Sequence, residues 1–309
     1  MRLILGISLL ALGYQTASAQ SLLETFGSGA NQFTMEFVTI GNPGNVADTT
    51  GSPNPAGSVA YTYNIGKYEV SRDQIDKANK AGNLRITYNT QWGGTGANKP
   101  ATGVSWYEAA QYVNWLNTST GGTAAYKFVG ETFQLWSAGD AGYNANNRFR
   151  NSLAKYWLPS SNEWYKAAYG NPNGTWNNYP TGSDSVPTAV PWGTAANTAV
   201  YNQTVTFGPA NITNAGGLSA YGTMAQGGNV AEWNETAYDG YNNEASENRD
   251  LRGGSWHSNI GLVASFRDSN IPTTKDDWNG FRVASVPEPS ALSLLAIGLG
   301  GLALVRRKK

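Results

Sequence analysis

Two short stretches in the last third of the chain decide how the sequence is interpreted: Gly228-Asn229-Val230-Ala231-Glu232-Trp233 and Arg252-Gly253-Gly254-Ser255-Trp256. Both contain glycine, and the segments around them are short and interrupted by further turn residues, as at Gly216-Gly217. Few of these segments are long enough for a regular helix or strand, so we expect a large share of irregular backbone. The abundant Asn, Ser and Thr side chains are suited to satisfy the polar groups of such a backbone.

Regular structure is predicted mainly upstream, where three helix starts share one signature. In each, a serine stands three residues before Gln or Glu, the capping box in which the two residues satisfy each other's backbone N–H groups. The three starts are Ser71-Arg72-Asp73-Gln74, Ser105-Trp106-Tyr107-Glu108 and Ser160-Ser161-Asn162-Glu163. We expect the first helix to end near Gly82 and the third near Gly170. In the second, Ala109, Val113 and Leu116 recur at helical spacing, so one face should lie in the core.

Strand-like alternation occurs in two segments before the first helix. Residues 33–40 alternate apolar and polar side chains, and residues 59–68 resume the pattern after a loop rich in Gly, Pro, Asn and Ser at 41–57. Residues 20–31 are interpreted as a short leader. The chain shows neither an internal repeat nor a linker of the kind found between domains. We therefore predict a single, loop-rich α+β domain with little regular secondary structure.

The composition excludes several classes of protein. The 309 residues include no cysteine, one histidine, 37 glycines and 11 tryptophans. Without cysteine there is no disulfide scaffold, Cys-type zinc site, iron–sulfur cluster or thiol nucleophile, and a single histidine excludes nearly every His-dominated metal centre. The 21 basic residues balance the 21 acidic ones, so the chain lacks the excess of positive charge that is typical of proteins that bind nucleic acid. A hydrophobic content of 40% indicates a globular protein.

The first 19 residues have the pattern of a secretory signal peptide. Arg2 precedes an apolar run at residues 3–12, and Ala17-Ser18-Ala19 supplies the small residues at which signal peptidase cuts. A short buried helix, the alternative, fits poorly because the run is positively flanked and lies at the extreme N-terminus. We therefore expect the mature protein to be secreted.

Residues 286–309, at the C-terminal end, have the pattern of a second targeting signal. Pro287-Glu288-Pro289 precedes an uncharged stretch at residues 290–305, and Arg306-Arg307-Lys308-Lys309 closes the chain. A membrane span needs about 20 apolar residues, so we expect a short transmembrane helix here, with its basic end in the cytoplasm. The order of these parts resembles the PEP-CTERM sorting signal of exported bacterial proteins. The resemblance implies recognition by an exosortase and a place at the cell surface or in the extracellular matrix of a biofilm, either anchored or released after processing.

Six short strings in a fixed order carry a second resemblance. They are the two stretches quoted first, together with Ile65-Gly66-Lys67-Tyr68-Glu69-Val70-Ser71, Thr102-Gly103-Val104-Ser105-Trp106, Trp157-Leu158-Pro159-Ser160 and Gly280-Phe281-Arg282-Val283. Together they resemble the sulfatase-modifying factor family, that is, the formylglycine-generating enzyme domain, over residues 33–284. The resemblance implies a single domain of C-type-lectin-like topology with little regular secondary structure, in agreement with the prediction from the residues.

The resemblance also implies where catalysis would occur. Catalytic members of the family oxidise a substrate cysteine with two active-site cysteines that hold copper, and these follow the Gly-Gly-Ser-aromatic string. Here Ser258 falls near the first of those positions, and the chain contains no cysteine. Because a serine hydroxyl neither binds Cu(I) well nor relays electrons, we expect no copper and no formylglycine generation. A divergent oxidoreductase of the family that uses no thiol is the alternative.

A calcium site is a further implication of the resemblance. Calcium prefers hard oxygen ligands on a tight turn. The implied ligands are the Glu232 carboxylate and the backbone carbonyls of Gly227, Gly228 and Val230. Alternatively, Glu232 pairs with an arginine such as Arg252 or Arg282.

Ligand binding is the function that the remaining residues favour. Related lectin-like domains carry variable ligand-binding residues between the last two strings, here residues 256–279. The candidates in this window are Trp256, His257, Ser258, Arg267 and Trp278. The serines beside His257 also suggest a hydrolase, but that chemistry needs an orienting acid and an oxyanion hole.

Aromatic and amide side chains favour one class of ligand. Tryptophan and tyrosine faces stack on sugar rings and amides bond to sugar hydroxyls, so an uncharged, exported surface of this composition suits extracellular polysaccharide. We predict an exported surface protein whose domain binds or scaffolds rather than catalyses.

Overall fold

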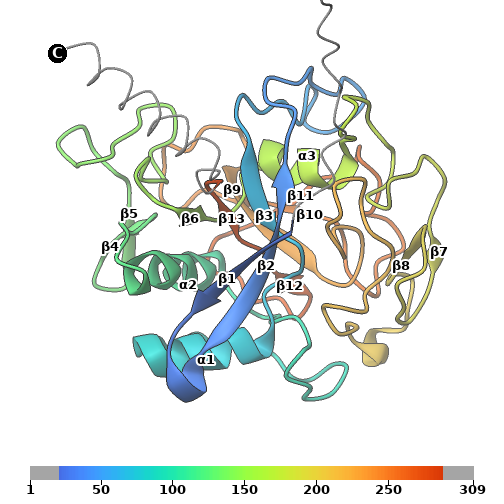
Figure 1. The fold of residues 1–309 in the computed structure, drawn as a ribbon, viewed down its shortest axis with the longest axis horizontal. Helices are drawn as coiled ribbons and strands as arrows, with labels where there is room; N and C mark the ends of the chain where they lie inside the picture. Colours follow the sequence, from blue (N-terminus) through green and yellow to red (C-terminus); the bar gives the residue numbers. More distant parts are fainter. Residues whose placement is uncertain (1–20, 288–309) are drawn as a thin grey trace, which may run out of the picture.

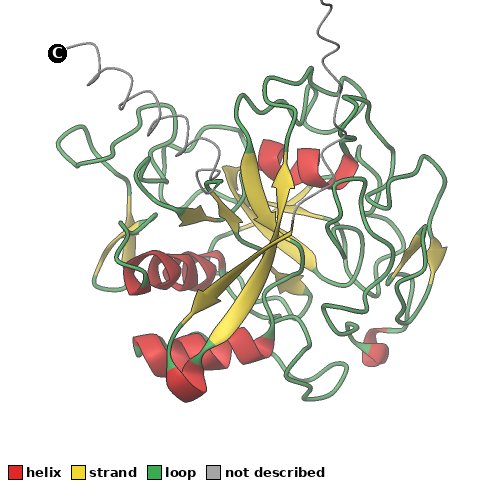
Figure 2. Ribbon diagram, in the orientation of Figure 1, coloured by secondary structure: helices red, strands yellow, loops and turns green. Residues whose placement is uncertain are grey.

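The computed structural model describes residues 21–287 of the chain. Most of this part is loop and turn. Figures 1 and 2 show the longest strands crossing the centre of the molecule, with the helices around them and long loops on one side. Small sheets and few helices make a loop-rich α+β domain, which confirms the fold class predicted from the sequence.

Two sheets organise the described residues. The first runs in the order β1 (Ser21–Phe26), β2 (Phe33–Ile40), β3 (Tyr63–Gly66), β13 (Ala284–Ser285) and β6 (Tyr156–Trp157). The second runs in the order β11 (Asp268–Asn270), β10 (Arg249–Arg252), β9 (Ala231–Ala237) and β12 (Asn279–Gly280). Two strand pairs stand apart: β4 (Lys127–Val129) with β5 (Thr132–Gln134), and β7 (Thr188–Ala189) with β8 (Thr198–Ala199).

β2 has the predicted bounds, whereas β3 is shorter than predicted. Along β2, Phe33, Met35 and Phe37 are buried, as alternation requires. The predicted second strand began at residue 59, but residues 59–62 belong to a loop. The N–H of Val59 donates to Asn45 Oδ1 at 3.2 Å, and its carbonyl accepts from the N–H of Gly44 at 2.8 Å. Strand pairing therefore starts only at Tyr63.

The prediction of a leader at residues 20–31 was wrong. Residues 21–26 form β1, which pairs antiparallel with β2 from Ser21↔Val38 to Phe26↔Phe33. The inward side of this edge strand contains Glu24, whose carboxylate accepts from Lys155 Nζ at 3.0 Å and from the hydroxyl of Tyr156. A buried acid breaks the apolar alternation by which a strand is recognised, and its partners come from a distant part of the chain.

Three helices begin as the capping boxes predict. They are α1 (Arg72–Gly82), α2 (Trp106–Ser119) and α3 (Ser161–Tyr169), and at each start both reciprocal hydrogen bonds of the box are present. Two 3₁₀ turns, η1 (Gly29–Asn31) and η2 (Val205–Phe207), complete the helical elements of the described residues. α1 and α3 end next to Asn83 and Gly170, close to the predicted positions.

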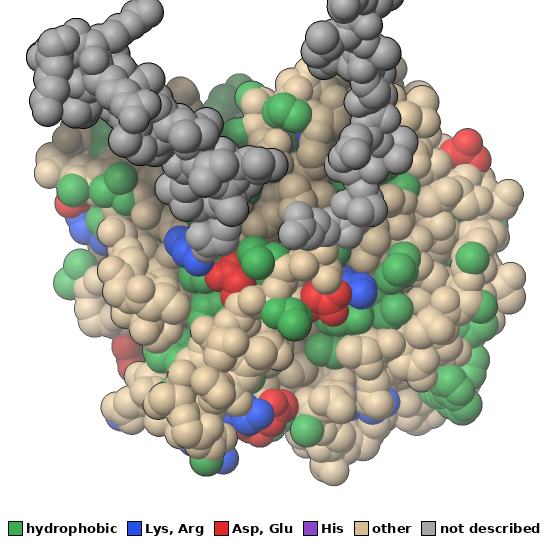
Figure 3. Space-filling model, in the orientation of Figure 1, with side chains coloured by type: hydrophobic (Ala, Val, Ile, Leu, Met, Phe, Trp, Pro, Cys, Tyr) green, Lys and Arg blue, Asp and Glu red, His purple; other side chains and the backbone are tan. Residues whose placement is uncertain are grey.

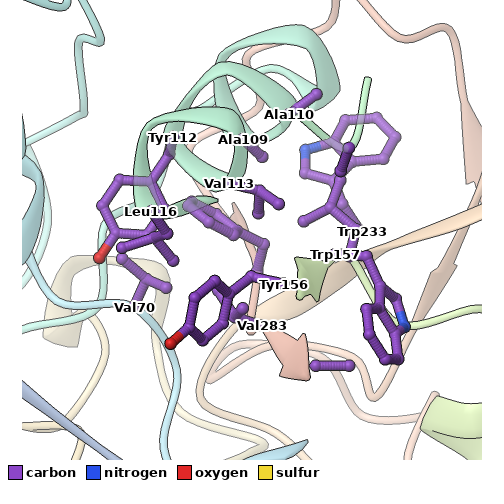
Figure 4. Packing of buried hydrophobic residues seen from close by; sticks show 14 of the residues in the cluster. Val70, Ala109, Ala110, Tyr112, Val113, Leu116, Tyr156, Trp157, Trp233 and Val283 are labelled. Carbon is purple, nitrogen blue, oxygen red and sulfur yellow. The ribbon is translucent and has the colours of Figure 1, made fainter. Parts of the chain in front are cut away.

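The main core lies between α2 and the five-stranded sheet. Ala109, Val113 and Leu116 of α2 are fully buried, which confirms the predicted face. Figure 4 shows these side chains pointing from the helix toward Tyr156 and Val283. Burial of apolar surface of this extent supplies the main stabilisation of the fold.

We expect removal of one cap to have a measurable but small cost. Replacing Ser105 with Ala removes the acceptor for the N–H of Glu108 and should lower the free energy of unfolding by about 1 kcal/mol. Urea unfolding of the full chain measures this difference. Ser119→Ala, an exposed serine at the other end of α2, is the matched control and should change stability by less than about 0.5 kcal/mol. Equal losses in the two variants would contradict the capping account.

No helix within residues 21–287 is long and apolar enough to cross a membrane. The transmembrane helix expected at residues 290–305 and the signal peptide at residues 1–19 lie outside the described residues.

Candidate functional site

The four-stranded sheet contains parts of the stretches at residues 228–233 and 252–256. β9 contains Glu232 and Trp233, and β10 ends at Arg252. The turn into β9 requires glycine at position 228, because φ there is +81° and a Cβ atom would lie 2.2 Å from the carbonyl oxygen of Val200. The glycine thus lets the chain pass Val200 closely and delivers Glu232 into the interior.

Glu232 is paired with Arg282 in the protein interior. Oε1 of Glu232 lies 2.5 Å from Nη2 of Arg282, Oε2 lies 2.6 Å from Nε, and both side chains are fully buried. Oε2 also accepts from the indole N–H of Trp164 at 2.7 Å. Two parallel N–H···O bonds of this kind are the strongest form of charge pairing. The contacts favour the ion-pair alternative for Glu232.

A calcium ion does not fit the Glu232 carboxylate as it is placed. Each of its oxygens accepts a hydrogen bond from the Arg282 guanidinium, and a cation at the same oxygens would stand next to that positive charge. Residues 21–287 contain no cluster of three or more His, Cys, Asp or Glu side chains suited to a metal. Calcium binding through the carbonyls of Gly227, Gly228 and Val230 stays a prediction.

A second buried carboxylate lies beside this ion pair. Glu69 accepts from Asn229 Nδ2 at 2.6 Å and from the N–H of Val230 at 3.2 Å. Burial and the negative charge of Glu232 raise the pKa of Glu69 well above its usual range, and Arg282 opposes that shift. Arg282 therefore compensates negative charge from two acids.

A cavity of about 160 Å³ opens at the same sheet, and all four of its strands contribute lining residues. The strand residues are Ala231, Leu251, Arg252, Asp268, Asn270 and Asn279. The loops add Trp278 and the segment that contains Ser255 and Ser258. Ligand sites for whole small molecules usually measure about 300–1,000 Å³, so this cavity suits a single group of a larger ligand.

Asn279 is the unusual residue of this cavity. Its side chain is 1% exposed, and neither its amide nitrogen nor its carbonyl oxygen has a hydrogen-bond partner among the described residues. A buried polar atom without a partner costs about 1–3 kcal/mol, so folded proteins rarely keep one without a use. Asn279 therefore adjoins the cavity with an amide whose nitrogen and oxygen are buried and have no partner within residues 21–287.

Ser258 lines the cavity, and its hydroxyl belongs to a short polar chain. Ser258 Oγ lies 3.0 Å from Ser255 Oγ, which lies 3.1 Å from Nδ1 of His257. The bond to Ser255 is the only hydrogen bond of the His257 side chain within the described residues, so no acid orients the ring as a triad requires. Burial lowers the pKa of His257, which favours the neutral ring.

Three aromatic rings from the predicted window lie in a row beside the cavity. The His257 ring is 5.1 Å from that of Trp256 on one side and 5.1 Å from that of Trp278 on the other. Trp256 is fully buried and belongs to a core cluster, whereas Trp278 lines the cavity and is 39% exposed. The structure thus places Trp278 where a ligand could touch it, whereas Trp256 is buried in the core and contacts the His257 ring.

Arg267 lies outside the cavity. Its Nε is 2.5 Å from Asp250 Oδ1, and its guanidinium stacks 4.3 Å from the centre of the Tyr238 ring. Arg252 pairs with the other oxygen of Asp250 at 3.1 Å.

Of the five candidates, the structure brings Ser258 and Trp278 to the cavity, with His257 adjacent. Asn279 was missed, although its place directly before Gly280-Phe281-Arg282 could have marked it.

The family follows from a match along nearly the whole described chain. The family described as the sulfatase-modifying factor enzyme 1-like domain matches residues 27–286. The chain belongs to this family. The PEP-CTERM protein-sorting motif matches residues 285–309. Both matches confirm what the sequence strings predicted, and the motif indicates export and C-terminal sorting to the cell surface through recognition by an exosortase.

Several solved structures share the fold of this sulfatase-modifying factor domain. Variable protein 1 of Treponema denticola is 21% identical, with a TM-score of 0.59 over 86% of this chain and 99% of that one. CarF is 18% identical, with a TM-score of 0.60 over 82% and 99%. PvdO from Pseudomonas aeruginosa is 19% identical, with a TM-score of 0.54 over 85% and 98%. No curated protein matches the chain in sequence. At these identities the structural likeness shows the fold.

Proposed function

We propose that this sulfatase-modifying factor domain is an exported binding module, and that its ligand enters the cavity beside Trp278 and bonds to Asn279. The single observation that supports the proposal most is the buried, unpartnered amide of Asn279 at the cavity wall. An amide offers one acceptor and two donor hydrogens, which a hydroxyl or amide group of a ligand can match.

Polysaccharide is the ligand class that the lining favours. The exposed face of Trp278 provides an apolar surface beside the polar Asn279, Asn270 and Ser258 side chains, and sugars carry hydroxyls around an apolar ring face. The exported location indicated by the sorting motif would bring the domain to extracellular polysaccharide. The size of the cavity suits one sugar unit of a chain.

A non-catalytic role is supported by the groups around Ser258. This chain has Ser258 near the position where the family's catalytic members have a cysteine, and its hydroxyl is engaged with Ser255 rather than with a base that an acid orients. If the full chain bound copper or iron stoichiometrically, the alternative of a thiol-free oxidoreductase would be favoured instead.

Asn279→Leu tests the proposal through two readouts of opposite sign. We expect the variant to bind at least tenfold less tightly to whichever polysaccharide the wild type recognises on a glycan array. We also expect its free energy of unfolding not to fall, and to rise by up to about 2 kcal/mol, because an unpartnered buried amide is removed. The control is Asn243→Leu, the same substitution at an exposed asparagine that does not line the cavity, and it should leave binding unchanged.

Two results would contradict this function. One is unchanged binding by Asn279→Leu. The other is a loss of stability of several kcal/mol, which would mean that the Asn279 amide has structural partners in the folded protein.

A further inference from the structure

A second hollow lies on a different part of the surface. It measures about 310 Å³ and is lined by Trp192, Phe207, Pro191, Pro209, Ala210, Lys99, Asn211 and Asn214. None of these residues lines the Asn279 cavity. Figure 3 shows hydrophobic side chains gathered at the lower right edge of the molecule, where β8 and η2 lie in Figure 1. We call Trp192, Phe207 and the adjoining amides of Asn211 and Asn214 the Trp192 platform.

The two aromatic rings of the platform are exposed although they are large. Trp192 is 59% exposed and Phe207 is 42% exposed, whereas Trp106, Trp164 and Trp233 are fully buried. The rings are nearly parallel, at 21°, with their centres 5.9 Å apart. Stacking holds each ring in one orientation and leaves an apolar surface open to solvent.

The backbone around the platform is held in place by hydrogen bonds. The N–H of Gly193, next to Trp192, donates to the carbonyl of Asn214 at 2.9 Å, which ties the tryptophan to an amide-bearing turn. At Gly208, φ is +71° and a Cβ atom would lie 2.1 Å from the nitrogen of Gly93, so only glycine permits the packing beside Phe207. A preorganised surface loses little entropy when it binds a ligand.

Free hydrogen-bonding capacity surrounds the rings. The side-chain amides of Asn211 and Asn214 make no hydrogen bond within residues 21–287, and both line the hollow. The one charged lining group, Lys99, donates from Nζ to the carbonyl of Pro209 at 2.5 Å, and burial lowers its pKa. The hollow therefore combines flat apolar rings with neutral donors and acceptors and contains no acid.

We propose that the Trp192 platform is a second binding site, whose ligand is a neutral pyranose unit of a polysaccharide. A pyranose has an apolar face that can stack on Trp192 and equatorial hydroxyls that Asn211 and Asn214 can bond at its edge. The absence of acidic groups and the engaged Lys99 favour an uncharged sugar over a charged one. The inference stands apart from the Asn279 cavity and does not depend on it.

Two hydrogen bonds nevertheless connect the segment that leads to Phe207 with the residues beside the cavity. The indole N–H of Trp256 donates to the carbonyl of Val205 in η2 at 3.0 Å, and η2 ends at Phe207. The N–H of Asn202 donates to the carbonyl of Ser258 at 2.8 Å. A polymer held at both sites would gain affinity from simultaneous binding.

Affinity electrophoresis of the full chain tests the platform. The native protein is run in gels that contain dextran, galactomannan or hydroxyethylcellulose, and retardation measures binding. We expect at least one of these neutral polymers to retard the wild type. Trp192→Ala and Phe207→Ala should each weaken that binding by about tenfold, through the loss of one stacked ring. Tyr241→Ala is the matched control, because this tyrosine is 69% exposed on another loop.

The variants also separate the two sites. If the Asn279 cavity is not a site but the platform is, Asn279→Leu binds as the wild type does while Trp192→Ala does not. The platform is overturned if no neutral polymer retards the wild type, if Trp192→Ala binds unchanged, or if Tyr241→Ala loses as much affinity as Trp192→Ala. Binding of a decaproline peptide that depends on Trp192, without retardation by any polysaccharide, would overturn the sugar and favour a peptide ligand.

Discussion

Arg282→Met should lower the free energy of unfolding by about 3–5 kcal/mol, since it leaves a buried carboxylate without its counter-ion. Arg282 makes two bonds to Glu232 and donates to the carbonyls of Gly66 and Met224, each at 2.9 Å. The guanidinium therefore connects β9 to the end of β3 and to the loop before β9. Urea unfolding of the full chain measures the loss.

The double variant Arg282→Met with Glu232→Leu separates charge from packing. Replacing a whole buried ion pair with apolar side chains of similar size costs less than breaking it. We therefore expect the double variant to be more stable than Arg282→Met alone. If the double variant is the less stable of the two, the free carboxylate is not the source of the loss.

The cost of Arg282→Met should also depend on pH. Arg282 opposes the rise in the pKa of Glu69, so its removal raises that pKa further. An acid whose pKa is higher in the folded than in the unfolded state binds its proton more tightly when folded, and stability then falls as pH rises. The loss of stability in Arg282→Met should be larger at pH 8 than at pH 5. A loss that does not change with pH would contradict the role of Glu69.

Asn117→Leu is the second substitution for which we expect a large effect. The fully buried side chain of Asn117 makes four hydrogen bonds. Nδ2 donates to the carbonyls of Val113 and Tyr156 at 3.0 and 2.8 Å, and Oδ1 accepts from the N–H groups of Lys155 and Tyr156 at 2.8 and 3.0 Å. These bonds fasten α2 to β6. Removing the amide deprives several buried backbone groups of a partner, at about 1–3 kcal/mol each, so we expect a total loss of about 3–6 kcal/mol.

The control for Asn117→Leu is the same substitution at Asn279. Both positions are buried asparagines, yet one amide is fully bonded and the other has no partner. We expect Asn117→Leu to destabilise the protein strongly and Asn279→Leu not to destabilise it. If Asn117→Leu is so unstable that little folded protein is obtained, Asn117→Ser provides a milder form, because its neutral hydroxyl keeps one donor and one acceptor without burying a charge. Equal effects of Leu at the two positions would contradict the hydrogen-bond account.

Local sequence signals predicted the parts of the fold that depend on neighbouring residues. Each capping box uses residues three apart, and all three helix starts were correct. The alternation at residues 33–40 gave the bounds of β2 because every contributing side chain lies within that strand. The six family strings predicted the fold of the remaining, mostly irregular part of the domain.

Signals that depend on distant partners were beyond the sequence. Strand β1 was not predicted because Glu24 interrupts its apolar pattern. The partners that allow this acid to be buried, Lys155 and Tyr156, lie far along the chain. The partner of Glu232 stayed open between two arginines until the structure showed Arg282. Asn117 and Asn279 look alike in sequence, and only the packed interior distinguishes a bonded amide from an unpartnered one.

The position of β13 determines how the domain bears a mechanical load. Ser285 and Ala284 pair with β3 on one side and with β6 on the other, and the N–H of the next residue, Val286, donates to the carbonyl of Lys155 at 3.0 Å. The sorting motif begins at the adjoining residues. If the domain were pulled while its C-terminal tail was held, the force would enter an interior strand and be shared by two ladders of hydrogen bonds. An edge strand such as β1 is paired on one side only, whereas β13 can leave the sheet only when both of its ladders break.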